Sequence, residues 1–227
     1  MPTVLITGAS RGFGLEFARQ YAADGWRVIA TARNPRTPSG LRKLAGDVRL
    51  HRLDVGDFAA IDALAVELAG IPIDVLLLNA GINPQPRGPA AAGTDYDVWP
   101  EALRINVMAQ LRCAVAFAPH LAQSRLKVMA AVSSGGASLS EPRGSNYVYR
   151  SSKAALNLCM AGLAREYKDR GLISVMLAPG WTRTDMGGPD APFALDDSVR
   201  KMRGVIAGLT PADSGRFITR DGRDNPW

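Results

Sequence analysis

Residues 146–157 read Asn-Tyr-Val-Tyr-Arg-Ser-Ser-Lys-Ala-Ala-Leu-Asn and place a phenol, Tyr149, four residues before an ammonium group, Lys153. On a helix this spacing puts both groups on one face. A Tyr ordinarily loses its proton near pH ~10, and a cation about 4 Å away at an effective dielectric of about 20 favours the phenolate by about 4 kcal/mol. Desolvation of the phenolate reduces that effect. The pair therefore predicts a Tyr that acts as general acid and base, although the same spacing also occurs between solvated neighbours without any chemistry.

A glycine-rich stretch near the N-terminus is a second candidate site. Apolar residues 4–6 lead into Thr-Gly-Ala-Ser-Arg-Gly-Phe-Gly at residues 7–14, and a helical pattern follows. In a strand–turn–helix unit, glycines let a ligand approach the backbone, and the free N–H groups of the helix attract phosphate. The spacing differs from G-x-G-x-x-G, and a helix-opening turn that binds nothing is the alternative. The dinucleotide contacts that we predict here are Gly8, Ser10, Arg11, Gly12, Phe13 and Gly14.

The residue that follows the second predicted strand, residues 26–32, bears on the choice of dinucleotide. An acidic residue there would bond the adenosine ribose, but this chain has Arg33. An Arg suits a 2′-phosphate, and Arg11 in the glycine-rich turn could supply a second charge. Each Arg alone also fits a solvated surface side chain. Together, and without an acid, they favour NADP(H) over NAD(H).

Two further strand ends carry candidate cofactor contacts. A third strand, residues 48–53, ends at Asp54, which could meet the adenine amino group or cap the helix predicted over residues 57–69, and both interpretations stay open. Val55 beside it is included among the predicted contacts. Residues 74–78 form a continuous apolar run, the pattern of a parallel strand covered on both faces. The small residues after this run would let a ligand approach the backbone, and they are Asn79, Ala80 and Gly81.

The rest of the chain continues to alternate between helices and strands. We expect a helix over residues 98–123 that contains Asn106 and is kinked or interrupted near Pro119. The next strand, residues 126–132, leads into Ser133 and Ser134. The elements expected after it are the helix of Tyr149 to about Arg170, a strand over 173–177, a helix over 196–207 and a last strand over 215–219.

This alternation predicts an α/β fold, a doubly wound parallel sheet of the Rossmann-like kind, in a single domain of residues 1–227. Open sheets of this type bind ligands just beyond the carboxyl ends of their strands. Four candidate residues fall at such ends, namely Gly12, Asn79, Ser134 and Gly180.

Composition narrows the class of protein. The 227 residues are 47% hydrophobic and 21% charged without an apolar run of eighteen, so we expect a soluble protein with a sizeable core and no membrane partner. The first residues carry no export signal, and Cys113 and Cys159 read as buried free thiols, so we expect a cytoplasmic location. His51 and His120 are isolated, which predicts no metal site. The net charge of +6 comes from scattered Arg residues rather than a basic run, so no nucleic-acid partner is expected.

The motifs named above, in this order over nearly the whole chain, resemble those of the single-domain short-chain dehydrogenases/reductases. Residues 179–188 and 221–227 resemble the C-factor-like and small carbonyl-reductase branch of that family. Two small departures are Leu78, where the family often has a second Asn, and Phe13, where Ile is frequent. Neither departure removes a group that the chemistry needs.

The resemblance implies a role for each matched residue. Tyr149 would be the general acid in carbonyl reduction, and Lys153 would lower the phenol pKa and bind the nicotinamide ribose. Asn106 would hold a water that relays protons, unless its side chain only bonds to strand backbone. Ser134, with Ser133 as the alternative, would donate a hydrogen bond to the substrate oxygen. The nicotinamide would rest against Pro179, Gly180, Thr182 and Thr184.

Two functions are compatible with this resemblance. The first is an NADP(H)-dependent oxidoreductase that transfers a hydride between the nicotinamide and a carbonyl or secondary-alcohol substrate. The alternative is a cofactor-binding signalling or regulatory protein with little turnover, but a pure binding module has no need of a tuned phenol. Family members often pair through the helices that carry Asn106 and Tyr149, and the apolar residues of those helices fit either a homo-oligomer or ordinary core.

Overall fold

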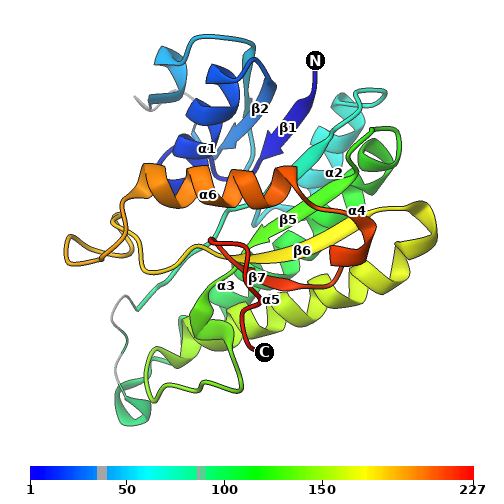
Figure 1. The fold of residues 1–227 in the computed structure, drawn as a ribbon. Coiled ribbons are helices and arrows are strands. Elements are labelled where there is room, and N and C mark those ends of the chain that lie inside the picture. The colour runs from blue at the N-terminus through cyan, green and yellow to red at the C-terminus, as the bar shows by residue number, and fades with distance from the viewer. Residues whose placement is uncertain (35–39, 86–87, 89) are drawn as a thin grey trace.

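The computed structural model describes residues 1–34, 40–85, 88 and 90–227. In this part of the chain seven strands form one parallel sheet, in the order β3-β2-β1-β4-β5-β6-β7, with helices on both faces (Figure 1). The chain winds outward from β1 to β3 and then crosses to β4 on the other side of β1, which confirms the predicted Rossmann-like sheet. The strands are β1 (Thr3–Ile6), β2 (Arg27–Ala32), β3 (Val48–Arg52), β4 (Val75–Leu78), β5 (Val128–Val132), β6 (Ile173–Ala178) and β7 (Phe217–Thr219).

Helices connect the strands and cover both faces of the sheet. The α-helices are α1 (Gly12–Ala23), α2 (Phe58–Glu67), α3 (Trp99–Leu103), α4 (Ala109–Ala122), α5 (Tyr147–Glu166) and α6 (Leu195–Ala207). Shorter turns are η1 (Gly40–Lys43), η2 (Ala91–Gly93), η4 (Gly135–Ala137), η5 (Lys168–Arg170) and η6 (Pro211–Asp213), which are 3₁₀-helices, and η3 (Arg104–Met108), which is a π-helix.

The core has two layers because successive side chains of a strand point to opposite faces of the sheet. Leu76 of β4 belongs to the layer that contains Phe117 of α4. The next residue, Leu77, belongs to the layer that contains Phe17 of α1 and Met202 of α6. Strands β4, β5 and β6 are buried along their whole length, as expected for parallel strands between helices (Figure 1).

The helix predicted over residues 98–123 is interrupted, but not at the predicted place. Helix α3 passes into the π-helix η3, which contains Asn106, and α4 then runs unbroken through Pro119. The helix is therefore interrupted at the π-helix and not near Pro119. Proline cannot donate a hydrogen bond to the carbonyl of Val115, but both residues are exposed, so water can hydrate that carbonyl.

Candidate active site

The turns after β1, β4, β5 and β6 lie at the carboxyl edge of the sheet, and the first half of α5 lies beside them (Figure 1). Four predicted residues, Gly12, Asn79, Ser134 and Gly180, are found in these turns or directly after them. The edge is where open α/β sheets bind their ligands.

The glycine-rich turn between β1 and α1 needs its glycines for close packing. Gly8 has φ +67°, and a Cβ on it would lie 3.0 Å from Ala80 Cα. A Cβ on Gly14 would lie 2.4 Å from the Gly8 carbonyl oxygen. Gly12, with φ +53°, faces open space, and within the described residues no side chain caps the first turn of α1. The open approach and the free N–H groups fit the phosphates of a dinucleotide.

Asn79 braces this turn from β4. Its Nδ2 donates hydrogen bonds to the carbonyls of Thr7, at 2.9 Å, and Gly8, at 3.1 Å. In return Thr7 Oγ1 accepts from the backbone N–H groups of Asn79 and Ala80. The side chain of Asn79 thus shapes the turn, and the small Ala80 and Gly81 follow at the crossing between β1 and β4.

The candidate adenosine contacts are spread over several turns. Arg33 is exposed just after β2, and Ser10 is exposed in the glycine-rich turn. Arg11 pairs with Asp185 at 3.2 Å, and both side chains are about three-quarters exposed, at 74% and 76%. Phe13 is half-buried and packs toward the core layer of α1 and α6.

Asp54 does not cap the helix that follows it. Its Oδ1 accepts a hydrogen bond from Gly56 N at 2.9 Å, whereas Asp57 Oδ1 accepts from Ala60 N at the start of α2. The interpretation of Asp54 as the cap is therefore wrong, because Asp57 directly precedes the helix and has the extended backbone of an N-cap residue. Asp54 itself is exposed, and Val55 beside it is buried.

Tyr149 and Lys153 lie one turn apart near the start of α5, where Lys153 is buried and Tyr149 is half-buried. Lys153 Nζ is 5.8 Å from the centre of the Tyr149 ring and donates to the Val132 carbonyl at 2.8 Å. The Ser134 side chain lies beside the Tyr149 phenol and favours its ionised form, which lowers the phenol pKa. The structure thus joins the end of β5, the turn after it and α5 in one polar cluster.

Burial dominates the ionisation of this pair. It raises the pKa of Tyr149 to about 12, and the neighbouring Ser134 side chain opposes the shift. Burial also lowers the pKa of Lys153 to about 8. The predicted lowering of the phenol pKa by Lys153 is therefore wrong in this structure, because both groups lose hydration and the ammonium bonds to the Val132 carbonyl.

The two serines after β5 point in different directions. Ser133 is buried, and its Oγ donates to Asn157 Oδ1 at 2.6 Å, inside the protein. Ser134 is half-buried, lies beside the Tyr149 phenol, and its Oγ accepts a hydrogen bond from Gly136 N at 3.1 Å. Of the pair, Ser134 is the one beside the phenol.

Asn106 is fully buried in the π-helix and bonds to loop backbone. Its Oδ1 accepts from Ile82 N at 2.8 Å, and its Nδ2 donates to the Ile82 carbonyl and to Ser152 Oγ. Gly81 separates Asn106 from Lys153, since a Cβ on Gly81 would lie 3.2 Å from Asn106 Oδ1 and 3.4 Å from Lys153 Nζ. The bond to backbone considered from the sequence exists, although its partner follows β4 and is not in a strand.

Two residues that support the site were not predicted. Gln110 Nε2 donates to the carbonyls of Ala80, at 2.8 Å, and Ile105, at 3.0 Å, so it ties the end of β4 to the π-helix. Arg150 Nε donates to the Gly136 carbonyl at 2.8 Å, beside Ser134. A buried polar residue in an apolar helical pattern is the sequence signal that points to Gln110, and Arg150 is adjacent to Tyr149.

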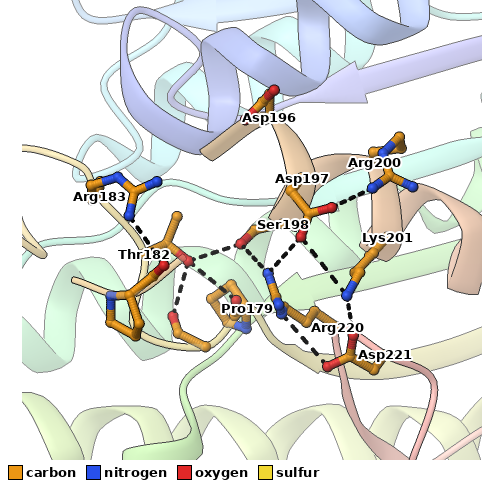
Figure 2. A network of polar contacts seen from close by, with 12 residues as sticks. Pro179, Thr182, Arg183, Asp196, Asp197, Ser198, Arg200, Lys201, Arg220 and Asp221 are labelled. Carbon is orange, nitrogen blue, oxygen red and sulfur yellow. Dashed lines mark hydrogen bonds and ion pairs between the residues drawn. The ribbon is translucent and has the colours of Figure 1, made fainter. Parts of the chain in front are cut away.

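The turn after β6 combines exposed and buried candidates. Pro179 is buried, and Gly180 has φ +76°. Thr182 is buried, and its Oγ1 contacts the carbonyls of Pro179 and Gly180, each at 3.2 Å, and Ser198 Oγ of α6, at 3.1 Å (Figure 2). Thr184 Oγ1 accepts from Gly187 N at 3.0 Å. The Thr182 side chain is thus directed toward α6, where it braces the turn from inside.

Within the described ranges, no group of three or more His, Cys, Asp or Glu residues could hold a metal ion. Of the helices in those ranges, none combines the length and the apolar character needed to cross a bilayer.

The amino-acid sequence is similar to those of known proteins. Residues 2–193 match the family model of the short chain dehydrogenases. The chain is 40% identical over 166 residues to the C-signal protein of Myxococcus xanthus, an alignment that covers 73% of this chain and 99% of that protein.

Two solved structures share the whole architecture. A Burkholderia multivorans protein described as a short-chain dehydrogenase/reductase, with NADP bound, superimposes with a TM-score of 0.88 at 32% identity, over 100% of this chain and 99% of the other. The NADPH-bound carbonyl reductase from chicken fatty liver superimposes with a TM-score of 0.90 at 31% identity, again over 100% and 99%. Sheet order, strand-end motifs and sequence similarity agree, and the chain therefore belongs to the short-chain dehydrogenase/reductase family, in the branch of the C-factor-like proteins and small carbonyl reductases.

Proposed function

We propose that this protein is an NADP(H)-dependent oxidoreductase that interconverts a carbonyl and a secondary alcohol, with residues 1–227 forming one catalytic domain. The observation that carries the proposal is the placement of Tyr149 between the Ser134 side chain and the buried Lys153 ammonium, whose Nζ lies 5.8 Å from the centre of the Tyr149 ring. Such a cluster offers a transferable proton and a second donor at one point of the ligand-binding edge.

Tyr149 and Ser134 act on the substrate oxygen. The phenol, whose pKa burial raises to about 12, keeps its proton until the oxygen gains charge, and then donates it. Ser134 donates a hydrogen bond to the same oxygen and stabilises that charge. In the oxidation direction Tyr149 takes the proton back. The nicotinamide, when bound, supplies or accepts the hydride.

Lys153 and Asn106 would return the proton to Tyr149. Lys153, whose pKa burial lowers to about 8, can release and regain a proton near neutral pH. A water bound beside Gly81, between Lys153 Nζ and Asn106 Oδ1, would link the ammonium to solvent. Gly81 supports this path because a side chain there would fill the space between the two groups.

The cofactor would lie along the strand ends. Gly8, Gly12 and Gly14 would face its phosphates, Asn79 to Gly81 its middle part, and Lys153 the nicotinamide ribose, with Pro179, Gly180 and Thr184 near the ring. Asp54 and Val55 would meet the adenine. The exposed Arg33 would bind the 2′-phosphate, and the NADP and NADPH bound to the two similar structures support this choice.

A regulatory role with little turnover is the second candidate. The similarity to the C-signal protein favours it, since the name of that relative describes a signal rather than a reaction. The proposal of an enzyme rests instead on the intact Ser134, Tyr149 and Lys153 cluster.

Pairing of two copies forms part of the proposal. Met108 and Val115, in η3 and α4, and Leu158, in α5, are large apolar residues with 51%, 41% and 73% of their surface exposed. Exposed apolar side chains on neighbouring helices support a homo-oligomer contact there. We also propose a cytoplasmic location and a small-molecule substrate.

Fluorescence titration with NADPH and NADH, followed by a panel of aldehydes and ketones, tests the proposed function. We expect micromolar NADPH affinity, a clear preference over NADH, and turnover of at least one carbonyl compound. Arg33→Ala should weaken NADPH binding by about tenfold and NADH binding hardly at all. Equal losses for both nucleotides would refute the 2′-phosphate contact, and binding without turnover would favour the regulatory role.

A further inference from the structure

Arg220 is an unusual residue because a charged side chain lies almost entirely inside the protein. It directly follows β7, its backbone N–H donates to the Ala178 carbonyl at 2.9 Å, and only 7% of its surface is exposed. A buried guanidinium is unfavourable unless its charge and its N–H groups find partners. Its partners therefore indicate what the residue holds together.

The guanidinium is clamped between α6 and the loop after β6. Its Nη1 donates to Asp197 Oδ2 at 3.1 Å and to Ser198 Oγ at 3.0 Å (Figure 2). Its Cζ lies 3.6 Å from the centre of the Phe193 ring, and its Nε lies 3.6 Å from Asp221 Oδ2. A planar cation can form this stack and these bonds at the same time, which an ammonium group cannot.

Two routes lead from Arg220 to the turn after β6. Through Ser198, the Thr182 hydroxyl is held 3.2 Å from the carbonyls of Pro179 and Gly180. Through the stacked ring, Phe193 backs Gly180 so closely that a Cβ there would lie 2.8 Å from two ring carbons. Both routes end on Gly180, and the first also reaches Pro179.

Thr182 and Phe193, the two residues that link Arg220 to the turn, also close the base of the loop of residues 179–193. Thr182 and Phe193 form an isolated β-bridge, and Arg183 N donates to the Phe193 carbonyl at 2.9 Å. The tip of the loop is joined to the glycine-rich turn by the exposed Arg11–Asp185 ion pair. Arg220 therefore holds the base, from which the rest of the loop extends.

We propose that Arg220 is a positioning residue that fixes the Pro179–Gly180 turn at the nicotinamide end of the proposed cofactor site. The inference rests on the proposed function, because that function places the nicotinamide at this turn. Arg220 itself does not touch the cofactor. It acts through Ser198 and Phe193, so its loss should affect the nicotinamide half of the ligand and spare the adenosine half.

Binding of a whole and a half cofactor tests this assignment. Arg220→Met should weaken NADPH binding by about tenfold, while the affinity for adenosine 2′,5′-bisphosphate, which lacks the nicotinamide, stays within about twofold of wild type. Arg216→Met is the matched control, because Arg216 also pairs with two carboxylates next to β7 but lies apart from the turn. It should leave both affinities unchanged.

The outcomes separate this inference from the proposed function. Equal weakening for both ligands, or none for either, in a folded Arg220→Met protein would overturn the positioning role. If wild-type protein binds neither ligand, the proposed cofactor site fails instead. Should Arg220→Met not fold, Ser198→Ala removes one route with a much smaller change and should show the same selective loss of NADPH affinity.

Limited proteolysis without nucleotide gives an independent readout. Arg183 is exposed at the base of the loop, and its backbone is held by Phe193. Trypsin should cut after Arg183 about tenfold faster in Arg220→Met than in wild type, because the β-bridge opens more often. An unchanged rate of appearance of the fragment ending at Arg183, measured by mass spectrometry, would contradict the clamp.

Discussion

The turn after β1 and the turn after β6 end on the same edge of the sheet, with β4 and β5 between them, but different interactions hold them. Glycines that leave no room for side chains, together with Asn79 bonded to backbone, shape the first turn. A buried Arg from beyond β7 and a Ser from α6 brace the second. The first turn therefore depends on steric fit between near neighbours, and the second on polar contacts from distant parts of the chain.

The difference has a consequence for the proposed cofactor site. The turn proposed to bind the phosphates is built from backbone and is expected to tolerate almost no change in volume. The turn proposed to meet the nicotinamide relies on side chains that can be exchanged one at a time, so substitutions there are expected to alter substrate and rate while the cofactor still binds. Between the two turns lies the cluster of Ser134, Tyr149 and Lys153.

The largest expected effect is on turnover, at the cluster between the two turns. Tyr149→Phe removes only the transferable proton, so we expect turnover to fall by about 10²- to 10⁴-fold with NADPH affinity nearly unchanged. Steady-state kinetics and nucleotide titration of the same preparation check this. Substantial residual activity would refute the proposed role of Tyr149 as the proton donor.

The next effect tests the steric fit of the first turn. Gly14→Ala places a Cβ 2.4 Å from the Gly8 carbonyl oxygen, so we expect a loss of about 3 kcal/mol in the free energy of unfolding, and weaker NADPH binding. Gly162→Ala is the control, since Gly162 lies in α5 with no atom within 4 Å of the added Cβ and should gain about 0.5–1 kcal/mol. Similar free energies of unfolding for the two variants in urea would contradict the steric explanation of the first turn.

A smaller effect follows from the burial of Lys153. Its pKa falls from 10.5 to about 8, so between these values the unfolded chain binds more protons than the folded protein, and stability rises with pH. This rise in stability is opposed above pH 9, because burial raises the pKa of Cys113 from 9.0 to about 12. Between those values the folded protein keeps a thiol proton that the unfolded chain loses, so this group lowers stability as the pH rises. From pH 8 to 9 wild type should gain about 1 kcal/mol relative to Lys153→Met. Parallel urea-unfolding profiles for the two proteins would rule out a depressed Lys153 pKa.

The smallest effect concerns the ion pair that joins the two turns. Arg11 and Asp185 are largely exposed, so Asp185→Asn should change the free energy of unfolding by less than about 0.5 kcal/mol. Thermal unfolding at low and high salt measures this. A large, salt-sensitive loss would mean that the two turns are mechanically coupled and that their separate description is wrong.

Residue spacing alone predicted much of this molecule. The apolar run that became β4, the glycines at 8, 12 and 14, and the Tyr149–Lys153 pair are local signals, because each depends on neighbours a few residues away. The same local logic failed at Pro119, which the exposed side of α4 accommodates, and at Asp54, where Asp57 stood closer to the helix start.

The order of the elements, the family and the strand ends that carry the candidate residues could all be predicted from the sequence, because hydrophobic period and turn residues are local features. The contacts between distant segments could not: which serine lies beside Tyr149, how Gln110 bonds to Ile105 in the π-helix of Asn106, and how Arg220 supports the turn after β6. The tertiary structure also decided the pKa of Tyr149, because burial depends on all the elements that pack around the phenol rather than on the Lys four residues away.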